Sequence, residues 1–278
     1  MLFKWIGLFI FLVSLSACSS FESHLEKATK LSSENKDKQA LKLALKAMSM
    51  AKNISQKSKA LRLVADICEK KLNDYNCALN SYNELLPLAV SKIELESFHY
   101  KIGEIYFVHL QDYEDALTHF SEVVENCVDP KLCIDARIKI ARSYYYKKEF
   151  LQSINEIDIL NSEHKEKTKV LNKIKFVESS ILHSQALMGL AKYEDAVKPL
   201  ESAMEKFPEE SNKQQVPILL SVAFRENSEY QKSLEVLEKY KIENKDPVAS
   251  VFIESQIEKM QNRLELQPGG PTGTTRRR

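Results

Sequence analysis

Glycine and tryptophan are scarce in this chain of 278 residues, and where they fall excludes several fold classes. There are six glycines in all, and between Gly7 and Gly269 there are only two, Gly103 and Gly189. Sheet proteins need glycine in their tight turns far more often than this. Alanine, leucine, lysine and glutamate fill the interval, with apolar residues three and four positions apart, so the body is predicted to be all-α. The one tryptophan, Trp5, lies in the first 17 residues.

The sequence also lacks the patterns of common catalytic and nucleic-acid-binding sites. It has no phosphate-binding loop, no GxSxG or HExxH segment and no CxxC pair. His99, His109 and His119 are ten residues apart, which scatters them over different helix faces. The net charge is +1, and without the arginines at 276–278 the body is mildly acidic, so no nucleic-acid surface is expected. We expect no enzyme, no cofactor, no metal and no small-molecule substrate.

The first 18 residues have the order of parts of a bacterial secretory signal. A basic start through Lys4 precedes an apolar run at residues 5–15, which is too short to span a bilayer comfortably. The closing tetrapeptide, LSAC, resembles a lipoprotein lipobox, which implies cleavage before Cys18 and acylation of that residue. By the same resemblance, Ser19 rather than an aspartate implies the outer membrane. We therefore predict a signal peptide at 1–17 and a lipidated tether at 18–21; the alternative is an unmodified thiol at a cleavage site.

A phrase made of an aromatic residue, a small residue three positions later and further apolar residues recurs through the body. The small residues follow one another at intervals of 37 to 43 residues. They are Ala40, in a degenerate copy, and then Ala78, Ala116, Ser153, Ala196 and Ser233. An earlier helical segment accompanies each of them, so the unit is a pair of antiparallel helices that approach closely at the small residue.

These repeats resemble the tetratricopeptide repeat, most clearly at residues 113–146 (YEDALTHFSEVVENCVDPKLCIDARIKIARSYYY). The units are longer than usual, with an extra residue in the first two turns and longer links. The resemblance implies a right-handed α-α superhelical solenoid of five to six helix hairpins over residues 22–266. A C-terminal capping helix would begin at Pro247, and the tail at 267–278 is predicted to be disordered. Long-link repeats behind a lipobox are similar to envelope proteins such as the outer-membrane assembly lipoprotein BamD and the CpoB-type periplasmic coordinators.

Four cysteines besides Cys18 form two pairs that are close in sequence. Cys68 and Cys77 lie on either side of a predicted helix-hairpin turn, and Cys127 and Cys133 flank an Asp-Pro step between repeats. Both pairs are candidate disulfides in an oxidising compartment. The alternative is buried free thiols, which are common in helical cores. Their spacings of nine and six do not suit zinc.

In this kind of repeat the first helices line a concave groove, where partner proteins would bind. Aromatic side chains near an arginine and a methionine suit such an interface. The predicted groove residues are Tyr100, Glu104, Phe107, Ile138, Arg142, Tyr145, Tyr146, Ile181, Gln185 and Met188. The alternative is that Tyr145 and Tyr146 pack the neighbouring repeat, although one of the two must face away from it. A helix or an extended segment is the expected partner.

The expected function is that of a non-catalytic, lipid-anchored scaffold in the bacterial envelope. It would face the periplasm from the outer membrane and bind envelope proteins during the assembly of outer-membrane or envelope complexes. Other functions remain open at this point: a pilotin or accessory lipoprotein of secretion or pili, or a regulatory subunit that docks a cell-wall enzyme. A cytosolic repeat protein whose N-terminus only resembles a signal is a further alternative.

Overall fold

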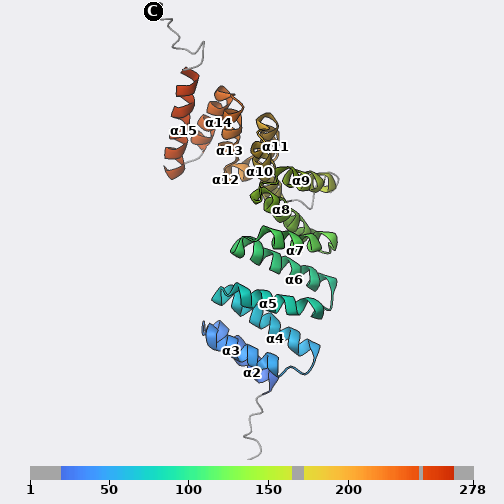
Figure 1. Ribbon diagram of the computed structural model, residues 1–278. Helices are drawn as coiled ribbons and strands as arrows, with labels where there is room; N and C mark the ends of the chain where they lie inside the picture. Colours follow the sequence, from blue (N-terminus) through green and yellow to red (C-terminus); the bar gives the residue numbers. More distant parts are fainter. Residues whose placement is uncertain (1–19, 165–171, 244–246, 266–278) are drawn as a thin grey trace, which may run out of the picture. The chain divides into compact units, whose positions relative to one another are not determined.

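The computed structural model describes residues 20–164, 172–243 and 247–265, and every regular element in these ranges is a helix. The all-α prediction is therefore confirmed. Helices that follow one another along the chain pack in pairs (Figure 1). The chain divides into two compact units, with the boundary between Gln111 and Asp112. We call them unit 1 and unit 2 and describe each by itself.

The first helix of unit 1 begins at Phe21, next to the predicted start of the solenoid at residue 22, and Ser20 caps its first turn. Several helices of unit 1 begin at polar side chains that accept a hydrogen bond from a backbone N–H: Ser20 from Ser23, Asn53 from Gln56 and Ser91 from Glu94. The elements are α2 (Phe21–Ser33), α3 (Asp37–Ser49), α4 (Ile54–Ile67), η2 (Cys68–Leu72), α5 (Tyr75–Leu85), η3 (Leu86–Leu88), α6 (Lys92–Glu104) and η4 (Ile105–Leu110).

Unit 2 continues the pattern with helix pairs and a closing helix. Its elements are α7 (Tyr113–Glu125), α8 (Pro130–Tyr146), α9 (Phe150–His164), α10 (Lys173–Gly189), α11 (Tyr193–Lys206), α12 (Pro208–Lys213), α13 (Val216–Glu226), α14 (Tyr230–Glu243) and α15 (Pro247–Glu265). Ile253 and Met260 of α15 pack with Leu234, Leu237 and Tyr240 of α14. The last helix therefore covers the apolar face of the hairpin before it, as expected of a cap.

The recurring small residues are buried at helix contacts. All six positions, from Ala40 to Ser233, are almost or completely inaccessible to solvent. At the last of them, the hydroxyl of Ser233 on α14 donates to the carbonyl oxygen of Ser221 on α13 at 2.8 Å. A larger side chain here would push the two helices apart, so the repeat pattern has a steric cause.

The extra residue in the first two turns appears as a short π-helix at the end of the first helix. In ordinary turns of this chain, such as α8–α9, the N–H of Glu149 donates to the carbonyl of Tyr144, five residues back. In the α4–α5 turn the N–H of Asp74 instead reaches Cys68, six residues back, and η2 fills the interval. The element η4 has the same form before Gln111. One added residue is thus absorbed without disturbing the hairpin.

Candidate functional site

Three predicted groove residues lie in unit 1, on α6 and η4. Phe107 is only 9 % exposed, so its assignment to a binding surface is wrong: its ring belongs to the interior. Tyr100 and Glu104 are half-buried.

Most of the seven groove residues predicted in unit 2 pack against neighbouring helices. Ile138 on α8 is 1 % exposed and lies in a cluster with Ile134 and Leu160, so its assignment to the groove is also wrong. Tyr145 packs against the cluster of Ala141, Ile157 and Leu182, and its ring centroid lies 5.6 Å from that of Phe150. Tyr145 therefore fits the alternative reading, in which it packs the neighbouring helices.

The other apolar groove residues of unit 2 divide between core and surface. Ile181 and Met188 on α10 are partly buried against the core formed by α10, α11 and α13. Tyr146 is exposed, and its ring stacks on that of Tyr113 with centroids 5.0 Å apart. Of the two adjacent tyrosines, Tyr146 is thus the one that faces solvent.

Arg142 takes part in a line of ion pairs between α8 and α10. Its guanidinium donates to Oε1 of Glu178 at 2.7 Å, and the other oxygen of Glu178 accepts from Lys175 Nζ at 2.9 Å. Lys175 also forms an ion pair with Asp135 of α8. We call these four side chains, Asp135, Arg142, Lys175 and Glu178, the charged face. Each is partly exposed, so the charged face can be reached from solvent.

The two carboxylates of this face act on the pKa of Lys175. Burial acts to lower the pKa of Lys175, but hydrogen bonds to Asp135 and Glu178 outweigh it, so the pKa lies above the usual value. Lys175 therefore stays protonated at neutral pH. With two cations and two anions, the face is neutral as a whole but presents alternating charges.

The sequence identified only Arg142 of this group. Asp135 and Arg142 are seven residues apart, two turns of one helix, and Lys175 and Glu178 are three apart, so each pair shares a helix face. This spacing indicates two charged helix faces but does not pair them. Nothing local indicates that α8 and α10 align these two pairs.

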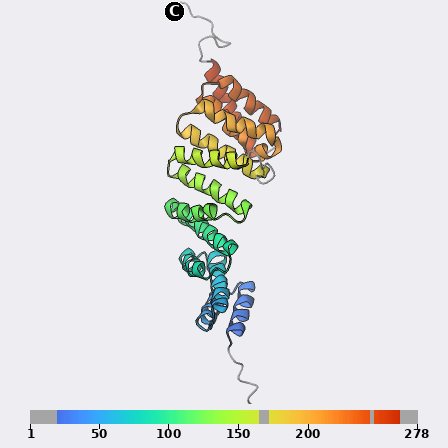
Figure 2. The same ribbon diagram turned by 90° about the vertical axis from the view of Figure 1, so that its right-hand side faces the viewer.

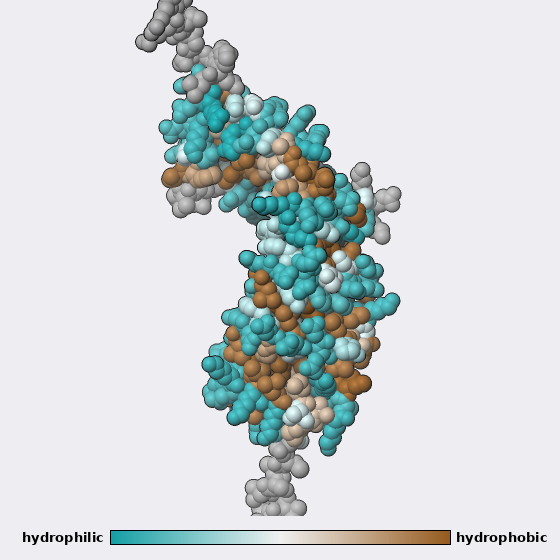
Figure 3. All heavy atoms as spheres, in the orientation of Figure 1, coloured by the Kyte–Doolittle hydropathy of each residue, from teal (hydrophilic) through white to brown (hydrophobic). Residues whose placement is uncertain are grey.

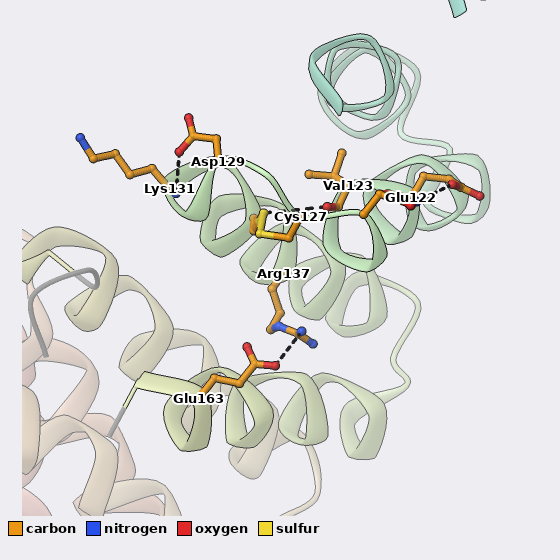
Figure 4. The surroundings of a disulfide bond; sticks show 9 residues. Glu122, Val123, Cys127, Asp129, Lys131, Arg137 and Glu163 are labelled. Atoms are coloured by element: carbon orange, nitrogen blue, oxygen red, sulfur yellow. Dashed lines mark hydrogen bonds and ion pairs between the residues drawn. A yellow bond between two sulfur atoms is a disulfide. The ribbon is translucent and has the colours of Figure 1, made fainter. Parts of the chain in front are cut away.

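Both candidate cysteine pairs are bonded. Cys68 is joined to Cys77 and Cys127 to Cys133, with S–S distances of 2.00 and 2.01 Å. The second bond links the end of α7 to the start of α8 (Figure 4). Below it, Arg137 forms ion pairs with Glu156 and Glu163 of α9 at 3.0 and 3.2 Å. A pocket of about 160 Å³ lies between these groups.

Cys18 and the predicted signal peptide and tail lie outside the described residues. No helix in the described part of the chain is long and apolar enough to cross a membrane.

Comparisons with known proteins identify the architecture. No family model matches this chain, and no curated protein matches it either. Among solved structures, a tetratricopeptide repeat protein from Parabacteroides merdae is 14 % identical, with a TM-score of 0.60 over 88 % of each chain. The fold is that of the tetratricopeptide-repeat proteins.

Two further structures show the same fold. YrrB, described as a tetratricopeptide-repeat protein with an unusual peptide-binding site, is 15 % identical, with a TM-score of 0.52 over 76 % of this chain and 97 % of its own. PilW, a type IV pilus biogenesis factor, is 11 % identical, with a TM-score of 0.53 over 80 % of this chain and 92 % of its own. At these identities the likeness concerns the fold alone.

Proposed function

We propose that this protein is a non-catalytic scaffold, anchored by lipid at Cys18 to the outer membrane of a bacterium, that binds a segment of an envelope protein at the charged face. Two independent features support this proposal: the lipobox-like end of the signal sequence, and the partly exposed ion pairs of α8 and α10. The repeat fold is consistent with it, because stacked hairpins offer long surfaces rather than a catalytic cavity.

The observation that carries the binding proposal is the alternation of charge along the first helices of two successive hairpins. Arg142 and Lys175 can donate to carbonyl or carboxylate groups, while Asp135 and Glu178 can accept from amides or basic side chains. A peptide segment with both kinds of group would exchange its bonds to water for bonds to this face. The peptide-binding site named for YrrB is a property of that protein, and it makes a peptide ligand a reasonable first candidate here.

A charge-reversal series tests the binding face. Arg142→Glu places a second carboxylate beside that of Glu178. The double variant Arg142→Glu with Glu178→Arg restores an ion pair between the two positions, with the positive and negative charges exchanged. The protein is crosslinked in cells, and the proteins captured with the parent are identified by mass spectrometry. We expect both variants to capture the main one at least about tenfold less, which corresponds to 1.4 kcal/mol. The double variant should recover most of the melting temperature that Arg142→Glu loses, although the arginine introduced at position 178 no longer bonds to Lys175, which keeps Asp135.

The matched control reverses an exposed ion pair on α12, with Lys213→Glu and Glu209→Lys. It should keep the partner. Retention of the partner by the Arg142→Glu, Glu178→Arg protein would place the binding site elsewhere.

The anchor is tested by mass spectrometry of the N-terminal peptide from cells. We expect it to begin at Cys18 and to carry acyl chains, and Cys18→Ser should release the protein from the membrane fraction. Each buried methylene contributes about 0.8 kcal/mol, so several chains on one residue hold a protein to a bilayer. A peptide that still begins at Met1, or carries no acyl chain, would contradict the anchor while leaving the binding face to its own test.

A further inference from the structure

One edge of unit 1 is formed by the segments nearest to Cys18. Phe21, the first residue of α2, packs with Ala47 of α3 and Ala60 of α4, with Ala51 beside them. Lys57 in the first turn of α4 forms an ion pair with Glu84 near the end of α5 at 3.0 Å. The starts of α2 and α4 and the end of α5 therefore meet at one edge (Figure 1).

The start of α6 belongs to the same edge. Arg62 of α4 forms an ion pair with Glu94 in the first turn of α6 at 2.8 Å, and Glu94 also accepts from the N–H of Val90 at 3.0 Å. The start of α6 and the link before it are thereby held beside the middle of α4. Figure 2 views this side of unit 1 face on.

This edge exposes large apolar side chains next to lysines. Ile54 is 62 %, Val90 83 % and Ile93 61 % exposed to solvent. Lys52, Lys57 and Lys92 are exposed within one to three residues of them along the chain. Figure 3 shows brown, apolar patches at the margin of the part of the molecule that carries α2–α6. We call these six residues the anchor edge.

We propose that the anchor edge lies on the membrane surface, with its isoleucines and valine at the level of the upper acyl chains and its lysines among anionic headgroups. The proposal rests on the lipid anchor proposed above. Cys18 precedes Phe21 by three residues, and an extended residue spans at most about 3.6 Å, so acyl chains on Cys18 would enter the bilayer within about 11 Å of the start of α2. The anchor edge includes the start of α4, which packs with Phe21 through Ala60, so a tether this short favours contact of the edge with lipid.

The chemistry of the edge fits that position. Apolar side chains gain free energy in the boundary between headgroups and acyl chains, and a lysine near an anionic surface contributes about 1 kcal/mol. The opposite ends of α4 and α6 run into η2 and η4. Those ends would face away from the membrane.

Tryptophan fluorescence can measure the orientation, because the sequence after Trp5 contains no tryptophan. We would place one at Ile93 on the anchor edge, or at Val108 in η4 as the control, since both are exposed and lie in unit 1. The two positions are 15 residues apart, which is about 22 Å along a helix. The lipidated proteins are incorporated into vesicles of phosphatidylethanolamine and phosphatidylglycerol with brominated acyl chains.

The expected result is quenching of the tryptophan of Ile93→Trp to about half or less of its intensity in vesicles without bromine, with a blue-shifted emission. Val108→Trp should change little. Ile54→Trp serves as a second reporter in case Ile93→Trp does not fold. Equal quenching at the edge and at Val108, or none at either, would overturn the proposal and leave a partner protein as the occupant of this edge.

A second arm separates this proposal from the lipid anchor. The same variants, starting at Ser19 behind a histidine tag, are held on vesicles by nickel-chelating lipid. Quenching at Ile93 but not at Val108 supports the membrane-facing edge even if Cys18 proves unmodified. An acylated Cys18 without quenching at Ile93 in either arm keeps the anchor and overturns the edge.

Discussion

The α4–α5 hairpin of unit 1 and the α8–α9 hairpin of unit 2 differ in the position of their disulfide. The first has a disulfide across its own turn, whereas the second is linked by a disulfide to the segment before it. In unit 1 the Cys68–Cys77 bond closes the turn within a hairpin, across the π-helix η2. In unit 2 the Cys127–Cys133 bond closes the link between α7 and α8, and the α8–α9 turn is the ordinary shorter one. The same repeat thus tolerates an added residue in a turn, and a crosslink at either end of a helix.

The cores of these two regions differ as well. Leu61, Leu85 and Ile102 of unit 1 belong to one large cluster that runs from α2 to η4. In the described part of α8 and α9, one group of buried apolar side chains is Ile134, Ile138 and Leu160. The mostly buried Arg137 lies beside that group, ion-paired to two glutamates. The α8–α9 hairpin therefore has a mostly buried polar contact beside its apolar side chains.

Core truncation should give the largest difference between the two regions. Leu85→Ala and Leu160→Ala each remove a fully buried leucine, a change that lowers the free energy of unfolding by about 2–5 kcal/mol. We expect Leu85→Ala to lie at the upper end, because its neighbours are packed on all sides. Leu160 lines the pocket near Arg137, which lets that site relax. Urea unfolding measures both, with Leu151→Ala, an exposed position, as the control. A larger loss for Leu160→Ala would reverse the comparison.

The disulfides should matter next, by roughly 2–3 kcal/mol each for loops this short. They should differ more in their rate of reduction than in their stabilising effect. Cys68 is completely buried, whereas Cys127 is exposed. Under mild reductant, alkylation followed by mass spectrometry should therefore find Cys127 and Cys133 modified first. Earlier modification of Cys68 and Cys77 would show that the α4–α5 turn opens readily.

Acid and alkali should test the two units separately. Burial lowers the pKa of His183 in unit 2 below 6.5, against a smaller opposing effect of Asp158. The unfolded state then binds a proton first, so stability is full above 6.5 and falls as the pH drops below that value. His183→Gln should reduce the fall of the free energy of unfolding below pH 6.5, as measured by urea unfolding at several pH values. If the variant loses as much stability in acid as the parent does, groups other than His183 cause the loss.

In unit 1 the corresponding group is Tyr82. Burial, and then the hydrogen bond that its hydroxyl donates to Glu69 at 2.6 Å, raise its pKa far above 10.0. Its contribution is full below 10.0 and is lost as the pH rises above that value, because the unfolded state loses the proton first. Tyr82→Phe should remove part of the alkaline loss of stability, whereas His183→Gln should not.

The left-handed residues of the turns should give the smallest effect. Asn73 after η2 has a φ of 53°, and Ala191 between α10 and α11 has a φ of 56°. Asparagine tolerates this conformation better than alanine does. Ala191→Gly should therefore stabilise the protein by about 1 kcal/mol and Asn73→Gly by less, as measured by thermal unfolding. Equal gains would mean that the two turns carry the same strain.

Predictions from the sequence succeeded where neighbouring residues decide the outcome. The small residues, the hairpin turns and the added residue before Asn73 and Gln111 all follow from spacing along the chain. The groove residues were less successful, because Phe107 and Ile138 are buried. Helical periodicity shows that a residue shares a face with others, but it does not say which neighbouring helix covers that face.

The sequence by itself determined that this protein is a series of helix pairs, because the periods of three to four residues and the small residue in each unit are local properties. Only the tertiary structure decided what Arg142 meets. Its partner Glu178 is 36 residues away, and the two groups touch because α8 and α10 stack with a particular offset. That offset depends on the packing of every side chain between the two helices, which no short stretch of sequence contains.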